Sequence, residues 1–293
     1  RKSTNKFKET KIATFGDSYA FCRYVSNDET WQHFLEKRLK KKVQNYGVGN
    51  FGLDQSFLKY EEKRKEKKLP NVLIFCVVPE TISRIHSYWK HYLEFGNKFG
   101  FKPIFKINSK GNLIKVDNFL KKRNLLEEIK KDLDYIQKLD IFFKIKFEKR
   151  KMKFPYSIVF FREISLYTKI FTFLTLHKLL FFFNKKHNKR FFDMAIQTVI
   201  KRNIKEADLF YNSPNFYLLL EKLIIEYSKK IQLEGKKFVL LIVPQKYDLE
   251  FKKVKKNNYE FFFSKLSKKI NILDLTDDFF SKENFKDLYL DDK

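Results

Sequence analysis

Short, uninterrupted apolar runs alternate with longer amphipathic segments near both ends of this sequence. The runs at 72–78 and 238–243 contain only apolar side chains, which is typical of strands buried on both faces of a parallel sheet. Shorter β-prone runs occur at 11–15, 43–46 and 270–275. Because helical spacing follows each run but the last, the pattern predicts an α/β protein with helices on both faces of a central parallel sheet.

The middle of the chain follows a different pattern. Residues 101–116 contain two β-prone pieces around Lys110-Gly111-Asn112, which predicts a hairpin. From 117 to about 204 the sequence is helical, aromatic and basic. We predict one domain spanning 1–293, with a helical insertion at about 101–214 between the third and fourth strands of the sheet. The remaining amphipathic segments predict helices at 30–40, 53–68, 80–95, 216–232 and 247–269.

Charge and cysteine content limit the partners that we expect. The 62 Lys and Arg residues exceed the 35 Asp and Glu residues and give a formal charge of +27, which suits a nucleic acid, an anionic membrane surface or an acidic glycan. The basic residues are mixed with acids, as in 61–68, and no nucleic-acid-binding motif is present, so we expect no nucleic acid. Cys22 and Cys76 have no metal-ligand spacing, so no metal site is predicted.

No targeting segment is visible in the sequence. The chain begins Arg1-Lys2-Ser3 without Met, as a fragment or a processed protein would. Its most apolar stretch, 170–183, is broken by His177 and Lys178 and is shorter than the roughly 20 residues that a spanning helix needs. We expect a cytoplasmic protein, either soluble or peripheral at the inner membrane.

The first chemistry-bearing motif is Gly16-Asp17-Ser18, at the end of the first predicted strand. A serine at a strand-to-helix turn projects its hydroxyl above the sheet, and its backbone N–H can stabilise an oxyanion. A serine that merely caps the helix would have the same sequence context. The tripeptide alone therefore does not separate a nucleophile from a cap.

The second motif is the glycine-rich loop at 45–52. A glycine at Gly47 lets a backbone N–H face the pocket as a second oxyanion donor. Gly47, Gly49 and Gly52 also spell the dinucleotide-binding fingerprint, and Glu80 ends the next strand, where a ribose-binding acid would stand. The 28 residues from Gly52 to Glu80 exceed the roughly 20 that the fingerprint requires, so we expect no cofactor.

The third motif is the acidic segment from Asp287 to Lys293, beyond the last predicted strand, where a triad carboxylate can stand. The order of the three motifs, with Asn45-x-Gly47 as the second, resembles the SGNH (GDSL-like) hydrolase superfamily. The resemblance covers about 10–95 and 215–293, and it implies the three-layer, flavodoxin-like sandwich of that family.

The resemblance also implies a role for each motif. Ser18 is the nucleophile, and the N–H groups of Ser18 and Gly47 form the oxyanion hole, with Asn50 as a substitute donor. Asp291 is the triad acid of an Asp-x-x-His motif whose histidine directly follows Lys293. The histidine takes the proton of Ser18, Ser18 attacks an ester carbonyl, and water or a sugar hydroxyl then receives the acyl group.

Two departures from the family pattern leave a second function open. Pro79 stands where the family has an Asn whose side chain completes the oxyanion hole, and proline offers no donor. No histidine of the sequence stands in the C-terminal motif. The five that are present lie on the first helix, after the third strand or in the insertion: His33, His86, His91, His177 and His187.

We expect a serine ester hydrolase, or a related O-acyltransferase, acting on a short, acetyl-like group of an acylated carbohydrate or another small ester. The alternative is a catalytically impaired, SGNH-like glycan-binding protein that lacks the family Asn. The insertion either packs its aromatic residues into its own core or forms an interfacial helix pair suited to an anionic membrane. Those aromatic residues are Tyr156, Phe160, Phe161, Tyr167, Phe171, Phe173 and Phe181–Phe183, beside the basic pairs Lys185-Lys186 and Lys189-Arg190.

Overall fold

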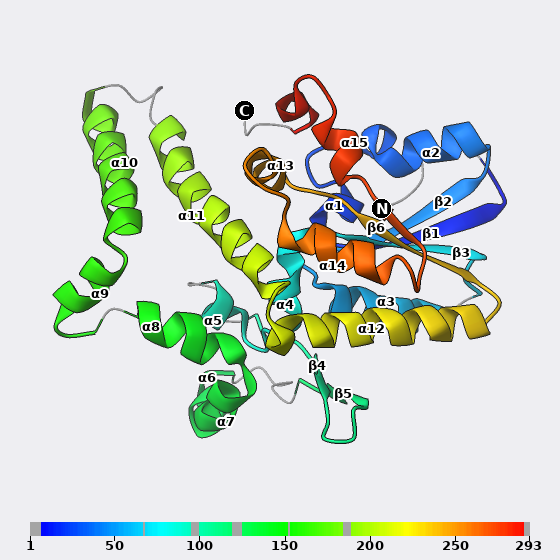
Figure 1. The fold of residues 1–293 in the computed structure, drawn as a ribbon, viewed down its shortest axis with the longest axis horizontal. Coiled ribbons are helices and arrows are strands. Elements are labelled where there is room, and N and C mark those ends of the chain that lie inside the picture. The colour runs from blue at the N-terminus through cyan, green and yellow to red at the C-terminus, as the bar shows by residue number, and fades with distance from the viewer. Residues whose placement is uncertain are drawn as a thin grey trace.

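The computed structural model describes residues 7–66, 68–94, 100–118, 125–151, 153–183 and 189–289. Its centre is a five-stranded parallel sheet in the order β2-β1-β3-β6-β7, which confirms the predicted α/β class (Figure 1). The observed strands differ from the predicted runs by no more than a few residues at either end. They are β1 (Thr10–Gly16), β2 (Lys42–Gly47), β3 (Val72–Val77), β6 (Lys237–Ile242) and β7 (Ile272–Asp274).

One face of the sheet carries the main hydrophobic core. Phe75 stands on the central strand, and its ring stacks on Phe15 at 5.1 Å and on Phe238 at 5.3 Å, between ring centroids. Helices α3 (Leu53–Glu66), α12 (Pro214–Leu233) and α14 (Asn258–Leu266) contribute the buried side chains that cover these rings. Aromatic residues on neighbouring strands thus form one continuous layer beneath three helices.

The other face of the sheet is more thinly covered. Helices α1 (Ser18–Phe21), α2 (Trp31–Leu39) and α15 (Thr276–Phe280) lie on this side. Between them an apolar groove of about 690 Å³ runs over strand residues such as Ile74 and Leu241. The sheet therefore has helices on both faces, as predicted.

Two of the predicted helices are interrupted. The segment 80–95 forms η2 (Pro79–Thr81), α4 (Ile82–Ile85) and α5 (Lys90–Leu93) instead of one helix. The interruption arises because Asp140, far along the chain, accepts hydrogen bonds from the N–H groups of Tyr88 and Trp89, each at 2.8 Å. The segment 247–269 likewise divides into α13 (Lys246–Lys252) and α14.

The middle of the chain is a long helical region between β3 and β6. It opens with the predicted hairpin, which is confirmed as the antiparallel pair β4 (Ile104–Ile107) and β5 (Leu113–Val116). Helices α10 and α11 lie side by side at the far end of this region (Figure 1). No helix in the described ranges is long and apolar enough to cross a membrane. The helical elements are α6 (Leu125–Lys131), α7 (Leu133–Leu139), the π-helical turn η3 (Phe143–Phe147), α8 (Glu148–Arg150), α9 (Tyr156–Arg162), α10 (Ile164–Phe183) and α11 (Lys189–Phe210).

Candidate functional site

Ser18 is the first residue of α1, directly beyond the carboxyl end of β1. The helix is capped by the residue before it, because Asp17 accepts the N–H of Tyr19 on Oδ1 at 2.9 Å. Within the described residues, neither the N–H nor the Oγ of Ser18 has a hydrogen-bond partner. The interpretation of Ser18 as a capping serine is therefore wrong: the cap is Asp17, and Ser18 is a half-buried residue of the first turn.

Two glycines allow α1 to pack tightly against the sheet. A Cβ atom on Gly16 would lie 2.7 Å from the Cβ of Ala20, and one on Gly47 would lie 2.6 Å from the Ala20 carbonyl carbon. Both distances are far below van der Waals contact, so a side chain at either position would displace the helix. The glycine at 47 is thus required by the close approach of α1 to β2.

Asn45 links the end of β2 to the Ser18 turn. Its Oδ1 accepts the N–H of Gly47 at 2.9 Å, and its Nδ2 donates to the Ala20 carbonyl at 2.8 Å. The Gly47 N–H is therefore already bonded and is not the free oxyanion donor that the sequence predicted. The Asn-x-Gly motif positions backbone here, because the Asn side chain satisfies the Gly N–H two residues later.

The loop after Gly47 contacts the first strand and borders a small cavity. The N–H of Val48 donates to the Gly16 carbonyl at 2.9 Å. Asn50 has a positive φ of 67°, and its exposed side chain helps to line a cavity of about 190 Å³ together with Gly49 and Arg84. Asn50 is thus placed at a cavity beside the loop that contacts the Ser18 turn.

The same geometry argues against a dinucleotide site. In an open parallel sheet the fingerprint turn lies where the strand order reverses, which in this sheet is between β1 and β3. The loop from Gly47 to Gly52 instead follows β2, an edge strand. Protein atoms occupy the space beside Gly47 and Gly52, so packing explains both glycines without a pyrophosphate.

A group of three polar side chains lies beyond the ends of β3 and β6, and the sequence had drawn attention to Glu80 alone among them. The Oε2 atom of Glu80 accepts a hydrogen bond from Gln245 Nε2 at 3.3 Å and lies 3.9 Å from an Arg84 guanidinium nitrogen. Glu80 follows β3 and Gln245 follows β6. The position of both residues just beyond buried strands was the available sequence signal, since parallel strands end at one edge.

Burial raises the pKa of two carboxyl groups near this edge of the sheet. The pKa of Asp17 is raised to about 6, chiefly because its carboxylate is desolvated, although Arg84 and the N–H groups of Tyr19 and Ala20 favour the charged form. Burial also raises the pKa of Asp248, which lies nearby in α13. The Asp17 carboxyl, directly before Ser18, therefore changes charge near pH 6.

The described histidines make their contacts away from Ser18. His86 Nε2 lies 2.9 Å from the Phe216 carbonyl oxygen, and burial lowers its pKa to about 4. The rings of the others lie against neighbouring aromatic rings. His33 contacts Phe34, His91 contacts Trp89 and Phe147, and His177 contacts Phe192, whereas His187 lies outside the described residues.

Two further predicted positions bear on the site. Pro79 is buried, and its carbonyl oxygen accepts the hydroxyl of Tyr211 at 2.9 Å, which ties the end of the helical region to the end of β3. Asp291, the predicted triad acid, lies outside the described residues. Tyr289, the last described residue, donates its hydroxyl to the Pro244 carbonyl at 2.8 Å, just beyond β6.

No protein-family model matches the chain, and no curated protein matches it significantly. The side chains at the carboxyl edge of the sheet are therefore the basis on which a function can be proposed. Of the predicted site residues, Ser18 begins helix α1, and this helix packs against β2 at Gly47. Asn50 borders a cavity beyond β2.

Proposed function

We propose that the protein is a serine ester hydrolase or O-acyltransferase of SGNH type, with Ser18 as its nucleophile. The observation that carries this proposal is the unbonded Ser18 hydroxyl, within the described residues, on a strand-to-helix turn that another residue caps. This turn stands at the carboxyl edge of a parallel sheet, where ligands of such sheets bind. The order of the Gly-Asp-Ser, Asn-x-Gly and C-terminal acidic motifs supports the same activity by resemblance.

The chain's own groups supply most of the proposed acyl transfer. The Ser18 Oγ gives its proton to a general base and attacks the ester carbonyl, and the unbonded Ser18 N–H faces the negative charge that develops on the carbonyl oxygen. The bond to the alcohol oxygen then breaks, and the alcohol leaves with that proton as the acyl-serine forms. The Asn50 side chain is the proposed second donor. The Gly47 N–H contributes only if it leaves Asn45, so we assign it no independent role.

The proposed acid of the triad is Asp291, which corresponds to the aspartate of the C-terminal motif in the family that the chain resembles. Tyr289 supports this proposal, because it is bonded beyond β6 and lines the same groove as Tyr19, the neighbour of Ser18. Asp291 follows Tyr289 by two residues in the sequence.

The proposed substrate is a short acyl ester on a carbohydrate. The test uses the protein expressed to its natural C-terminus, a fluorophosphonate probe and a p-nitrophenyl acetate assay. Ser18→Ala is expected to abolish labelling and turnover without unfolding the protein, whereas Ser165→Ala, at an exposed serine of α10, keeps both. Equal labelling of the Ser18→Ala variant would exclude Ser18 as the nucleophile.

Pro79 favours the second candidate, a glycan-binding protein without turnover, because it supplies no side-chain donor for the oxyanion. The two candidates differ in one measurement. The enzyme is labelled at Ser18 by the fluorophosphonate, and the binding protein is not labelled although it retains acylated oligosaccharides on an affinity column.

We also propose that α9 and α10 contact an anionic membrane surface. Ile164, Phe171 and Leu179 are 45%, 54% and 53% exposed, and their spacing places them on one face of α10. The only Asp, Glu, Lys or Arg residues between 164 and 183 are Lys169 and Lys178. An exposed apolar stripe with cationic neighbours is the pattern of a helix that lies at a lipid interface.

Vesicle co-sedimentation tests the membrane contact. The protein is expected to bind phosphatidylglycerol vesicles more strongly than phosphatidylcholine vesicles, and a Phe171→Ser, Leu179→Ser double variant is expected to lose most of that binding. Leu233→Ser is the matched control, since this leucine is 90% exposed at the end of α12. Equal binding by the double variant and the control would remove the proposal.

A further inference from the structure

A second cavity lies between the helical middle region and the carboxyl edge of the sheet. Its volume is about 210 Å³, and its walls come from η2, α4, the end of α5, the 142–150 segment and α11. Glu80 lines this cavity and also bonds Gln245 and neighbours Arg84 in the candidate site. The cavity therefore adjoins the edge at which the acyl transfer is proposed.

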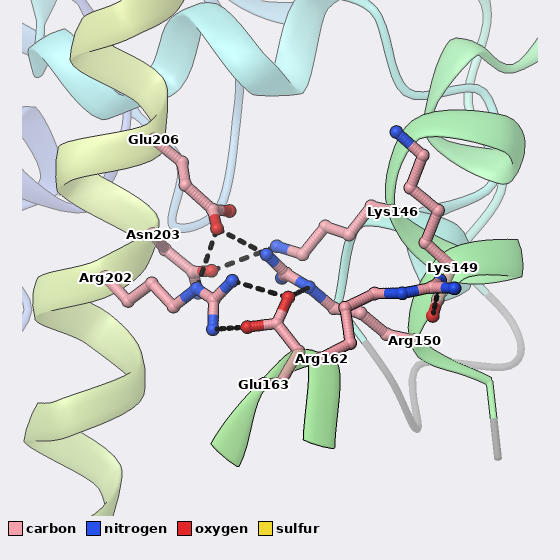
Figure 2. A network of polar contacts seen from close by, with 8 residues as sticks. All are labelled: Lys146, Lys149, Arg150, Arg162, Glu163, Arg202, Asn203 and Glu206. Atoms are coloured by element: carbon pink, nitrogen blue, oxygen red, sulfur yellow. Dashed lines mark hydrogen bonds and ion pairs between the residues drawn. The ribbon is translucent and has the colours of Figure 1, made fainter. Parts of the chain in front are cut away.

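Lys146 projects into this cavity from η3. Its side chain is buried, with 8% of the residue exposed, and its Nζ donates one hydrogen bond, to Asn203 Oδ1 at 2.9 Å (Figure 2). Within the described residues, no carboxylate lies within 4.0 Å of this ammonium. Burying a charge without an ionic partner costs free energy. An acceptor that binds the Lys146 ammonium would offset this cost.

The carboxylates around the cavity already have cationic partners. Glu206 is paired with Arg150 and with Arg202, the latter at 2.8 Å, and Arg202 also binds Glu163 (Figure 2). On the other side, Glu94 is paired with Lys90 at 3.1 Å, and Glu80 with Arg84 at 3.9 Å.

Four carboxylates, Glu80, Glu94, Glu163 and Glu206, are thus paired with four cations, of which Arg150 also lines the cavity. Lys146 is a buried cation of the lining that has no carboxylate within ion-pair distance in the described residues. One additional negative charge would balance it. A phosphate monoester carries about 1.5 to 2 negative charges at neutral pH, and it would be overcharged beside three glutamates. A carboxylate carries one charge and matches the single ammonium.

We propose that this cavity binds the carboxylate of an acidic sugar of the uronate class, with Lys146 as its ionic partner. This inference rests on the proposed function and makes that function more specific, because it names an acidic glycan as the substrate. Asn203 and Ser83 offer polar groups for hydroxyls, and Phe142 and Ile145 offer an apolar wall. The volume suits a single ring and not an oligosaccharide chain.

Burial and the neighbouring Arg150 lower the pKa of Lys146 to about 8, whereas Glu206, Glu94 and Glu80 act in the opposite direction. A bound carboxylate would favour the charged ammonium and raise that pKa. The lowered pKa is consistent with a cation that has no carboxylate partner of its own.

Calorimetry on the full chain at pH 7 tests the cavity with four probes: glucuronate, glucose, propionate and glucose 6-phosphate. Glucuronate is expected to bind at least tenfold more tightly than each of the other three. Lys146→Met is expected to remove this preference, and Lys149→Met is expected to keep it. Lys149 is exposed, and its side chain points away from the polar network (Figure 2). Equal affinity for glucose and glucuronate, or an unchanged preference in Lys146→Met, would overturn the inference.

A measurement on the unaltered protein covers the case in which Lys146→Met does not fold. In a spectrum of ¹⁵N-labelled lysine side chains, glucuronate is expected to shift the Lys146 signal, and glucose is not; no shift with glucuronate contradicts the proposal. The uronate site and the enzymatic function can also be excluded independently of each other. Fluorophosphonate labelling without glucuronate binding removes only the uronate site, and glucuronate binding without labelling removes only the enzymatic function.

Discussion

The side-chain amide of Asn45 donates to the carbonyl oxygen of Ala20 at 2.8 Å and so ties the end of β2 to the helix that begins at Ser18. Helix α1 has a single turn, and the last carbonyls of a helix have no partner within it. Gln32, from α2, donates to the same carbonyl at 2.7 Å. Two amides from different elements therefore hold the short helix that carries the proposed nucleophile.

Replacing Asn45 by Ala is expected to destabilise the protein by about 2 kcal/mol, because the buried Gly47 N–H and Ala20 carbonyl each lose a partner. Urea unfolding measures the loss, and fluorophosphonate labelling of Ser18 is expected to slow in parallel. Asn112→Ala, in the exposed hairpin turn, is the control. An Asn45→Ala variant as stable as this control would show that the amide does not hold α1.

Gly47→Ala is expected to disrupt the Ser18 turn, since the new methyl group would lie 2.6 Å from the Ala20 carbonyl carbon, and backbone cannot rotate away as a side chain does. We expect loss of Ser18 labelling and a fall in the denaturation midpoint. Gly49→Ala, in the same loop, places its methyl 3.6 Å from the Arg23 side chain and is expected to change stability by less than about 1 kcal/mol. Similar stability of the two variants contradicts this packing role for Gly47.

Asp17→Asn is expected to alter how stability depends on pH. The folded pKa of Asp17, about 6, is above its ordinary value of 3.8. The folded state thus favours the protonated carboxyl, and this contribution is full below pH 4 and is lost as the pH rises through 6. The loss amounts to about 3 kcal/mol at most.

The amide that this substitution introduces does not ionise, so the variant is expected to gain stability relative to the wild type between pH 4 and pH 7. Urea unfolding of both proteins at the two pH values measures this difference. A stability difference that stays constant across the range would show that Asp17 titrates normally in the folded protein.

Glucuronate affinity is expected to fall above pH 8, because the ligand binds the charged form of Lys146, whose pKa is about 8 in the free protein. The dissociation constant should rise by up to about tenfold per pH unit above that value. Glu80, Glu94, Glu206 and Arg150 also face the cavity. Titration calorimetry from pH 7 to 9.5 tests this, and a flat profile speaks against Lys146 as the partner.

Asp140→Ala is expected to cost about 3 kcal/mol or more, since three N–H groups lose a charged acceptor. These belong to Tyr88, Trp89 and Phe142, each at 2.8 Å from the carboxylate. Asp134→Ala, on the exposed side of α7, is the matched control. Hydrogen exchange is expected to quicken at residues 88 and 89 in the Asp140 variant alone, and unchanged exchange there would contradict the role.

The strands were predictable because a strand that is buried on both faces of a sheet has an unbroken run of apolar residues in its sequence. The runs at 72–78 and 238–243 became the paired central strands β3 and β6. The segment 80–95 was not predictable in the same way. Its helix stops where Asp140, more than 40 residues later, takes the N–H groups of Tyr88 and Trp89, and no local pattern encodes that contact.

The candidate site was likewise predictable from the sequence only in part. Gly16-Asp17-Ser18 and Asn45-x-Gly47 are local motifs, and the structure places them side by side at one edge of the sheet. The use of the Gly47 N–H by Asn45 depends on side-chain orientation, which a motif does not specify. The cavity around Lys146 joins residues from four separate segments, so no spacing in the sequence could indicate it.

The ion pairs of Arg150, Glu163, Arg202 and Glu206 all join residues of the middle region to one another. That region is inserted at a single point between β3 and the strand that follows, and much of its polar framework is internal. On the proposed function, the group that would select the glycan and the group that would react with it therefore belong to separate segments of the chain. Substitutions in the framework around Lys146 are then expected to change which glycan is bound without altering the turn at Ser18.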